Sequence, residues 1–257
     1  MPGAEVRVSV CLASYDGAAW IVEQVRSILD QLGPDDELVV VDDASTDDTV
    51  ALVQRIGDPR ISLWGNETNV GYVRTFERAL GRARGAYLLL SDQDDVWVPG
   101  RLEALVAALD RDGVVASSVA VLGEPDDPPR WRLRAADSHR YAANVAAVLV
   151  GVRWYFGCGM GLRRDVLDLV LPFPAWLTES HDLWIGLVGN VHHEMGHLEA
   201  ASVRRRLHEA NQTPQRWRSL PAILQARVML ARCLVEARRR RRVHVGSGTG
   251  RRAQPNR

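Results

Sequence analysis

Acidic residues gather directly after two very apolar segments of this 257-residue sequence. Asp42 and Asp43 end one apolar run, and Asp92, Asp94 and Asp95 follow another. In open α/β sheets ligands bind outside the carboxyl ends of the strands, so we expect both clusters to face one crevice. In an extended segment Asp92 and Asp94 point to the same side, where a cation would relieve their repulsion. Oxygen donors favour Mg²⁺ or Mn²⁺, and a solvated acidic turn is the alternative.

The apolar segments that precede these clusters have the pattern of buried strands. Continuous apolar and β-branched runs of this kind, alternating with helices, are typical of a parallel sheet covered by helices on both faces. The sequence therefore predicts an α/β fold. The strands predicted in the first half lie at residues 6–13, 37–42, 61–64, 86–91 and 114–122.

Amphipathic patterns predict the helices that join these strands. One helix is predicted to end at Ile56, with Ser45 or Thr46 as its N-cap. Residues 123–152 are less regular and include a proline-rich surface loop. The other predicted elements are helices at residues 20–32, 71–83, 99–109, 182–191 and 217–242, a strand and then a helix within 155–171, and a strand at 197–207.

Four segments occur in one characteristic order: VSVCLASYDG at residues 8–17, VVDDASTDDT at 40–49, NVGY at 69–72 and SDQDDVW at 91–97. Together they resemble the inverting family 2 glycosyltransferases with the GT-A fold, most closely bacterial rhamnosyltransferase-like members. The resemblance runs from about residue 6 to residue 213. It implies transfer of a sugar from a nucleotide donor, dTDP-L-rhamnose, to a hydroxyl of a glycan or lipid-linked glycan in cell wall or polysaccharide biosynthesis.

The resemblance also implies an organisation of the chain. A GT-A-type, Rossmann-like domain would cover residues 1–215, with a nucleotide-binding half at 1–122 and an acceptor half at 123–215. A basic amphipathic helix would follow at 216–242. The Gly/Ser/Arg-rich residues 243–257 are predicted to be a disordered tail.

Individual roles on the donor side follow from the matched motifs. Asp94 would bind the metal directly, and His208, in a segment where relatives carry a histidine near the diphosphate, would be a second ligand; a solvent-facing histidine is the alternative. Asp92 would lie near the ribose or a metal-bound water, and Asp95 would orient the donor sugar. Thr75 departs from the asparagine that relatives often carry. The remaining donor-binding residues implied are Ala13, Ser14, Tyr15, Asp43 and Arg74.

The segment ESHDLW at residues 179–184 resembles the family motif that carries the catalytic base, which would be Asp182. The chemistry supports a carboxylate there, because an inverting transfer is a single displacement in which one group must take the proton of the acceptor hydroxyl. A helix N-cap is the structural alternative for Asp182. His181, Trp97 and Trp184 would lie on the acceptor side, although core packing explains either indole equally well.

A second motif indicates a different class of enzyme. Residues 193–197 read HEMGH, which matches the H-E-x-x-H helix of zinc metalloproteases. Ala200 and Val203 replace the glycine and histidine of the extended metzincin pattern, and the strand predicted from His197 argues against a continuous helix.

Two further alternatives keep the donor but change the reaction. A nucleotidyltransferase would need a basic phosphate-binding loop after the first strand, and residues 14–19 contain no Arg or Lys. A non-catalytic sugar-nucleotide-binding module would not need the full set of Asp92, Asp94 and Asp182. The glycosyltransferase prediction is therefore preferred.

The net charge of zero, from 32 basic and 32 acidic residues, hides two opposed parts. Residues 203–257 hold 15 arginines and two glutamates, a net charge of +13, and residues 1–202 hold the balancing −13. The apolar stripe before Arg238–Arg242 predicts a basic amphipathic helix that binds an anionic membrane surface, each Arg adding about 1 kcal/mol. Packing of this helix on the domain is the alternative. Nucleic acid is not expected, because no aromatic residues are interleaved with the arginines.

Compartment follows from what the sequence lacks. Cys11, Cys158 and Cys233 are scattered and form no disulfide framework, so a reducing cytoplasm is the expected location. No signal-peptide pattern opens the chain, and no window has the roughly 18 uninterrupted apolar residues of a membrane span. We therefore expect a cytoplasmic protein in peripheral contact with the inner face of the cell membrane.

Overall fold

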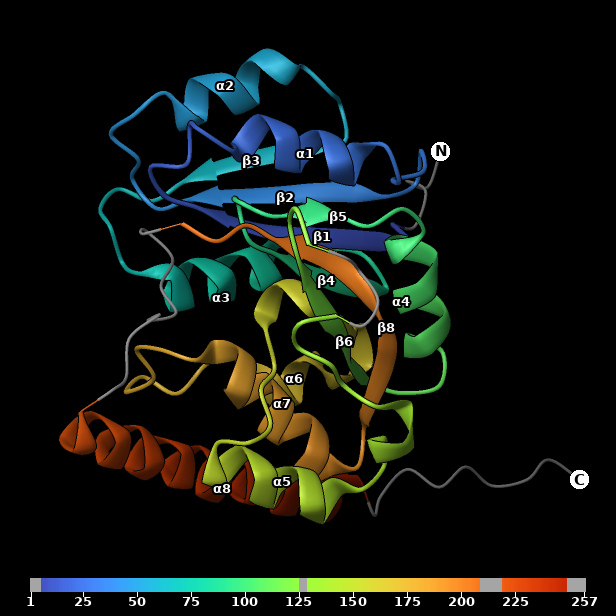
Figure 1. Cartoon of the computed structure of the whole chain (residues 1–257), viewed down its shortest axis with the longest axis vertical. Coiled ribbons are helices and arrows are strands. Elements are labelled where there is room, and N and C mark those ends of the chain that lie inside the picture. Colours follow the sequence, from blue (N-terminus) through green and yellow to red (C-terminus); the bar gives the residue numbers. More distant parts are fainter. Residues whose placement is uncertain (1–5, 125–128, 209–218, 249–257) are drawn as a thin grey trace, which may run out of the picture.

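A computed structural model describes residues 6–124, 129–208 and 219–248 (Figure 1). One eight-stranded sheet runs through it in the order β3-β2-β1-β4-β7-β6-β8-β5. The predicted α/β class with a mostly parallel sheet is confirmed. The strands are β1 Val8–Ser14, β2 Glu37–Asp42, β3 Ile61–Gly65, β4 Tyr87–Ser91, β5 Val96–Trp97, β6 Val114–Val121, β7 Met160–Arg163 and β8 Met195–Arg205.

Helices cover both faces of the sheet, which is why its central strands are apolar throughout. Side chains of β1 alternate between the two faces: Val10 and Leu12 belong to the core cluster that includes residues of α1, α2 and α4, whereas Cys11 belongs to the one that includes residues of α3, α7 and α8. The helices are α1 Ile21–Leu29, α2 Thr49–Ile56, α3 Tyr72–Arg82, α4 Arg101–Leu109, α5 Tyr141–Val150, α6 Leu167–Val170, α7 His181–His192 and α8 Leu220–Gly248.

The direction of strand β7 determines which residues meet at the carboxyl ends of the parallel strands. It runs antiparallel to both β4 and β6, whereas β1, β2 and β4 are mutually parallel and β8 is parallel to β6. The start of β7 therefore lies at the edge where β1, β2, β4, β6 and β8 end. Gly161 allows the close packing of this strand, because a Cβ there would lie 2.7 Å from Leu89 Cδ2.

Several predicted elements differ from the structure. Helix α2 begins at Thr49 rather than after Ser45 or Thr46, because the Ser45 hydroxyl instead donates to Asp42 Oδ2 at 2.5 Å. Helix α5 lies inside the segment predicted to be irregular; its sequence is nearly all apolar although only Asn144 and Val148 are buried, so no apolar stripe alternates with a polar face. Helix α8 continues to Gly248, so residues 243–248 are helical rather than part of a disordered tail.

Parts of other predictions lie outside the described residues. These are the end of the family resemblance at 209–213, the predicted boundary between domain and helix at 215–216, and the tail at 249–257. The division into two halves at residue 122 stays a prediction. Within the part of the chain that is described, no helix is both long enough and apolar enough to cross a membrane.

Candidate active site

The acidic turn after β4 is bent rather than extended. The chain bends at Gln93 and Asp94, so the alternation expected for Asp92 and Asp94 does not apply there. The turn instead brings Asp92 and Asp95 together with Cys158, their ligand atoms lying within 4.8 Å of one another. Burial and the charge of Asp94 raise the pKa of Asp95 to about 7. Burial, then the charges of Asp95 and Asp94, raise the pKa of Asp92 well above its ordinary value.

The two predicted metal ligands meet at this turn. His208 Nε2 lies 2.8 Å from Asp94 Oδ2, and the imidazole stacks on Trp20 with centroids 4.1 Å apart and planes at 13°. Arg206 fastens the same segment, since its backbone N–H donates to Asp95 Oδ1 and its Nε donates to the Asp94 carbonyl, both at 3.1 Å. The parallel pairing of β8 with β6 carries His208 to the edge where β4 ends.

A glutamine pair holds the loop after β1 against this turn. The side chain of Gln93 accepts from the backbone N–H of Tyr15 at 2.8 Å and donates to the Tyr15 carbonyl at 2.9 Å. Buried Gln24 donates to the Ser91 hydroxyl and to the Asp92 carbonyl. Gly17 leaves room for this contact, because a Cβ there would lie 2.3 Å from Gln93 Oε1.

The predicted donor-binding residues of β1 and β2 lie at the same edge. The Asp43 carboxylate accepts from Asn66 Nδ2 and from the backbone N–H groups of Val70 and Gly71, so it holds the turn that leads into α3. The buried Ser14 hydroxyl donates to Asp42, and the ring of Tyr15 is exposed. Ala13, partly buried, precedes them on β1. Of this set, the Tyr15 ring is the group most open to a ligand.

Asp182 occupies the first turn of α7, facing the start of β7. Ser180, in the left-handed region at φ 59°, stands at the N-cap position and donates its N–H to the Tyr72 hydroxyl at 3.0 Å, so Asp182 is not the N-cap. The Asp182 carboxylate accepts from the backbone N–H of Leu183 at 2.7 Å and from that of Gly157. Burial raises the pKa of Asp182 to about 6, although these amides oppose the shift.

Arg74 is predicted to bind the nucleotide, but its side chain contacts the loop that precedes α7. Its guanidinium donates to four carbonyl groups of the loop between α6 and α7, and it pairs with Glu77 at 2.6 Å. These contacts commit Arg74 to holding the loop that leads to Asp182. The four acceptors are the carbonyl oxygens of Phe173, Pro174, Ala175 and Leu177.

The three residues predicted on the acceptor side are buried. The Trp184 indole donates to the Val170 carbonyl, and Trp97 packs beneath the Arg101 guanidinium at 4.5 Å, so packing favours the core alternative for both indoles. His181 stacks on Phe76, and burial lowers its pKa to about 3, which keeps the ring neutral.

Arg205 also lies at this site, although the sequence motifs do not indicate it. It is buried at the end of β8, with its guanidinium 5.6 Å from the centroid of the Trp131 ring and 5.2 Å from that of Phe156. Its positive charge lowers the pKa values of Asp92, Asp95 and Asp182, against the larger effect of burial. The available signal was alternation along the strand, which puts Arg205 on the same face as buried Val203.

The zinc protease motif does not form a site. Helix α7 ends at His192, His193 has a left-handed backbone at φ 65°, and β8 begins at Met195. Two histidines four residues apart share a face only on a continuous helix. Instead His193 stacks on Tyr141, and His197 pairs with the Tyr155 hydroxyl at 3.0 Å.

The match to a protein family covers most of this site. The sequence profile of Glycosyl transferase family 2 matches residues 9–171, more than half of the chain. The chain therefore belongs to glycosyl transferase family 2. The matched range includes the acidic turn, and Asp182 and His208 lie beyond it.

Curated relatives include two proteins named as sugar transferases. The Escherichia coli UDP-Glc:alpha-D-GlcNAc-diphosphoundecaprenol beta-1,3-glucosyltransferase WfgD is 32% identical over 193 residues, covering 70% of this chain and 69% of WfgD. The putative teichuronic acid biosynthesis glycosyltransferase TuaG of Bacillus subtilis is 40% identical over 98 residues, covering 37% of this chain and 39% of TuaG. Several relatives are matched over less than half of their length, such as 30% of the succinoglycan biosynthesis protein ExoO of Rhizobium meliloti.

Solved structures share the fold. Staphylococcus aureus TarS 1–349 in complex with UDP-GlcNAc superposes with a TM-score of 0.66 at 20% identity, covering 87% of this chain and 66% of TarS 1–349. The mannosyltransferase PcManGT of Pyrobaculum calidifontis in complex with GDP-Man and Mn²⁺ superposes with a TM-score of 0.58 at 20% identity, covering 97% of this chain and 76% of PcManGT. These likenesses confirm the predicted GT-A-type fold.

Proposed function

We propose that the chain is an inverting glycosyltransferase that moves a sugar from a nucleotide donor to an acceptor hydroxyl. One observation carries this proposal: a single edge of the sheet gathers Asp92, Asp94, Asp95 and His208 together with the partly buried Asp182. A donor diphosphate needs a positive charge beside it. The three aspartates and His208 would supply this charge by binding a metal ion. A single displacement needs one base, which Asp182 would supply.

The residues present fit a divalent cation. Buried Asp95 Oδ2 has no hydrogen bond within the described part of the chain, and the clustered carboxylates raise the pKa values of Asp92 and Asp95 through mutual repulsion in addition to burial. Asp94 and His208 would hold Mg²⁺ or Mn²⁺, since carboxylate and imidazole are ligands that such ions accept. When bound, the ion would stabilise the negative charge of the departing nucleoside diphosphate.

Asp182 is suited to take the acceptor proton. A pKa of about 6 leaves its carboxylate ionised at neutral pH, yet more basic than an ordinary aspartate. The two backbone N–H groups that it accepts would hold it in place. Arg74 and Tyr72 would act through the loop before α7, by fixing where that helix begins. The charge of Arg205 lowers the pKa of Asp182, after the backbone N–H groups of Leu183 and Gly157, and so would favour the ionised carboxylate.

We propose a class of donor and a class of acceptor. The donor class is a nucleoside-diphosphate sugar, with dTDP-L-rhamnose, implied by the sequence motifs, and UDP-glucose, named for WfgD, as the first donors to test. The acceptor would be a hydroxyl of a glycan or of a lipid-linked glycan, because WfgD is named for a diphosphoundecaprenol-linked substrate. Such an acceptor would place the enzyme at the cytoplasmic side of the membrane, with the basic C-terminal helix against anionic lipid.

A thermal-shift screen tests the donor assignment. A bound ligand raises the melting temperature in proportion to the logarithm of its concentration over its Kd. We expect one of dTDP-L-rhamnose, UDP-glucose or GDP-mannose to stabilise the wild type in the presence of Mn²⁺ and to lose this effect in EDTA or in the Asp94→Ala variant. Asp30→Ala, an exposed aspartate after α1, is the matched control and should respond as the wild type does. Equal stabilisation with and without Mn²⁺ would remove the metal from the proposal.

A further inference from the structure

Helix α8 has two apolar faces, of which one is packed on the domain. Leu230, Cys233, Leu234 and Ala237 are buried in the same core cluster as α7. On the opposite side Leu224, Val228 and Val235 follow one another at intervals of four and seven residues, and they are between 54% and 67% exposed. Residues at this spacing share one side of a helix, so these three form an exposed apolar stripe.

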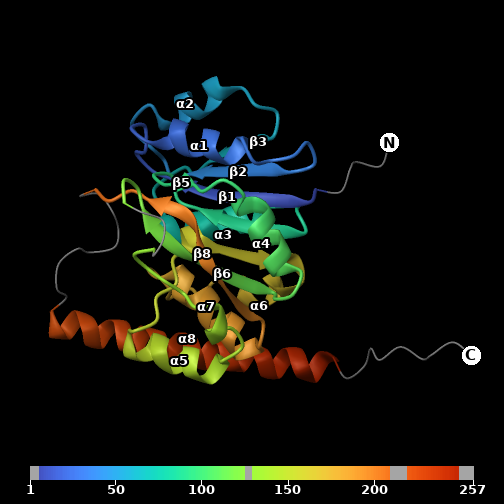
Figure 2. The same ribbon diagram turned by 45° about the vertical axis from the view of Figure 1, so that its right-hand side comes forward.

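Apolar side chains on both flanks widen this stripe. Val150 and Val152, 70% and 73% exposed, lie at the turn after α5. This turn contacts α8, because a Cβ on Gly151 would lie 2.1 Å from Arg227 Nη2. On the other flank Trp176 lies under the Arg232 guanidinium at 4.3 Å and lines a hollow of about 420 Å³ with Val228 and Val235. Figures 1 and 2 both show α5 and α8 side by side at the end of the molecule opposite α2.

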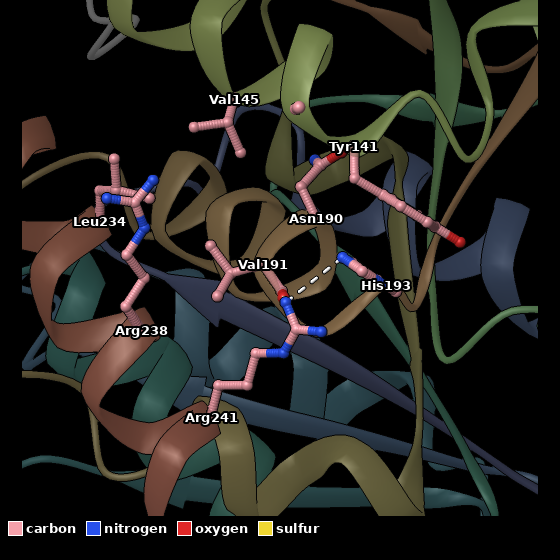
Figure 3. A pocket seen from close by; sticks show the side chains of 9 residues that line it. Tyr141, Val145, Asn190, Val191, His193, Leu234, Arg238 and Arg241 are labelled. Atoms are coloured by element: carbon pink, nitrogen blue, oxygen red, sulfur yellow. Dashed lines mark hydrogen bonds between the residues drawn. The ribbon is translucent and has the colours of Figure 1, made fainter.

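The arginines at the end of α8 divide between the domain and the outside. Arg240 donates to the carbonyl groups of Leu169, Val170 and Pro172. Arg241 donates to the Val191 carbonyl at 2.8 Å and lies against His193, beside a pocket of about 220 Å³ (Figure 3). These two arginines fasten the helix. The exposed ones are Arg238, Arg239 and Arg242.

We propose that this surface, the α8 outer face, docks on an anionic membrane with α8 parallel to the bilayer plane. We define the α8 outer face by Val150, Val152, Trp176, Leu224, Val228 and Val235, with Arg232, Arg238, Arg239 and Arg242 at its margins. The apolar side chains enter the boundary between headgroups and acyl chains, and the arginines reach the lipid phosphates. Two copies of so basic a face repel each other, which favours anionic lipid over a second copy of the chain.

The inference rests on the proposed function for its biological purpose but not for its geometry. Figure 1 places the N-terminal end of α8 on the side of the molecule where β8 ends, which is also the side of the candidate active site. Docking through the α8 outer face would therefore leave that site beside the membrane surface, where a lipid-linked acceptor presents its sugar. The position of this face therefore favours an acceptor that is itself held at a membrane.

Co-sedimentation with vesicles tests the face directly. The full chain, without donor, is mixed with vesicles of phosphatidylcholine alone or of phosphatidylcholine and phosphatidylglycerol in equal parts. We expect binding to the anionic vesicles only. The triple variant Leu224→Ser, Val228→Ser, Val235→Ser and the charge-reversal pair Arg239→Glu, Arg242→Glu should each lower the affinity about tenfold or more. Trp64→Ser removes a comparably exposed apolar residue from β3, away from α8, and should change nothing.

Two results would overturn the docking surface. Equal binding of the wild type and the charge-reversal pair to anionic vesicles is one, and this pair leaves the buried Leu230, Cys233, Leu234 and Ala237 of α8 unchanged. The other is a dimer in analytical ultracentrifugation that the triple variant dissolves, in a protein that binds no vesicle; the face would then belong to a second copy. Asp182→Asn should bind vesicles as the wild type does, so failure of the catalytic proposal is separable from failure of this one.

Discussion

The acidic edge of the sheet and the α8 outer face carry opposite charge in opposite surroundings. At the edge, Asp92, Asp95 and Asp182 are held by burial and backbone contacts, and the pKa of each is raised. On the outer face, Arg239 and Arg242 are exposed, and Arg239 forms an ion pair with Glu236 at 2.8 Å. Buried charge at the edge can be tuned for chemistry, whereas exposed charge on the helix serves long-range attraction. A net charge of zero describes neither region.

The same difference separates arginines from one another. Arg205 lies among carboxylates and aromatic rings, and Arg240 lies over the Trp184 ring at 4.9 Å while it donates to carbonyl groups of the domain. Arg242, two residues further along α8, is exposed. The role of an arginine in this chain therefore follows from its position on the strand or helix rather than from its place in an arginine-rich run.

The largest effect is expected from Asp182→Asn at the acidic edge. The amide keeps the shape of the carboxylate but cannot take a proton, so kcat for transfer should fall by about 10² to 10⁴. The KM for the donor should stay within about twofold, because Asp182 would act on the acceptor. Steady-state kinetics measure both. Asp168→Asn, an exposed aspartate on α6, is the control, and an unchanged kcat in Asp182→Asn would eliminate this residue as the base.

Substitutions on the two faces of α8 should separate stability from membrane binding. Leu230→Ala removes a buried side chain and should lower the free energy of unfolding by about 2 to 5 kcal/mol. Val228→Ala, on the exposed stripe, should lower it by less than about 0.5 kcal/mol while weakening vesicle binding. Urea denaturation followed by circular dichroism gives the first quantity. A large loss of stability in Val228→Ala would mean that the exposed stripe is packed on the domain.

The smallest effect is expected in the pH profile. Because the pKa of Asp182 is raised to about 6, the base is lost as the pH falls through that value, and kcat should drop about tenfold per unit below it. Removing the positive charge in Arg205→Met should shift this limb to higher pH, because Arg205 lowers the pKa of Asp182. Initial rates between pH 5 and 8 show the limb. A limb that stays in place in Arg205→Met would separate Arg205 from the base.

Much of the fold could be predicted from local pattern. The run 37–42 is apolar because β2 is buried on both faces. The strand therefore has the predicted bounds, residues 37 and 42. Helix α5 could not be found in this way, since its exposed side carries alanine and valine rather than polar residues and so gives no amphipathic pattern. The direction of β7 could not be predicted from local pattern either. Strand patterns carry no direction, and only the pairing with β4 and β6 shows that β7 runs antiparallel.

Part of the candidate site could also be predicted from local sequence, and part depends on how the strands pair. Motifs at strand ends placed Asp42, Asp43 and the acidic turn at one edge, because parallel strands end together. The contact between Asp94 and His208 joins residues 114 positions apart, and the motifs rather than any local pattern proposed both as ligands. The contribution of Cys158 to the acidic cluster depends on β7 running backwards, which no local spacing indicates.

We propose that transfer at the acidic edge is a single displacement with Asp182 as base. Proton NMR of the product, on the donor found by the thermal-shift screen, measures the anomeric configuration of the transferred sugar directly. One displacement inverts that centre, so we predict a β-linked product from an α-linked donor, or the reverse, formed by the wild type and absent in Asp182→Asn. A product that keeps the configuration of the donor would contradict the account, because retention requires a second displacement or a different mechanism.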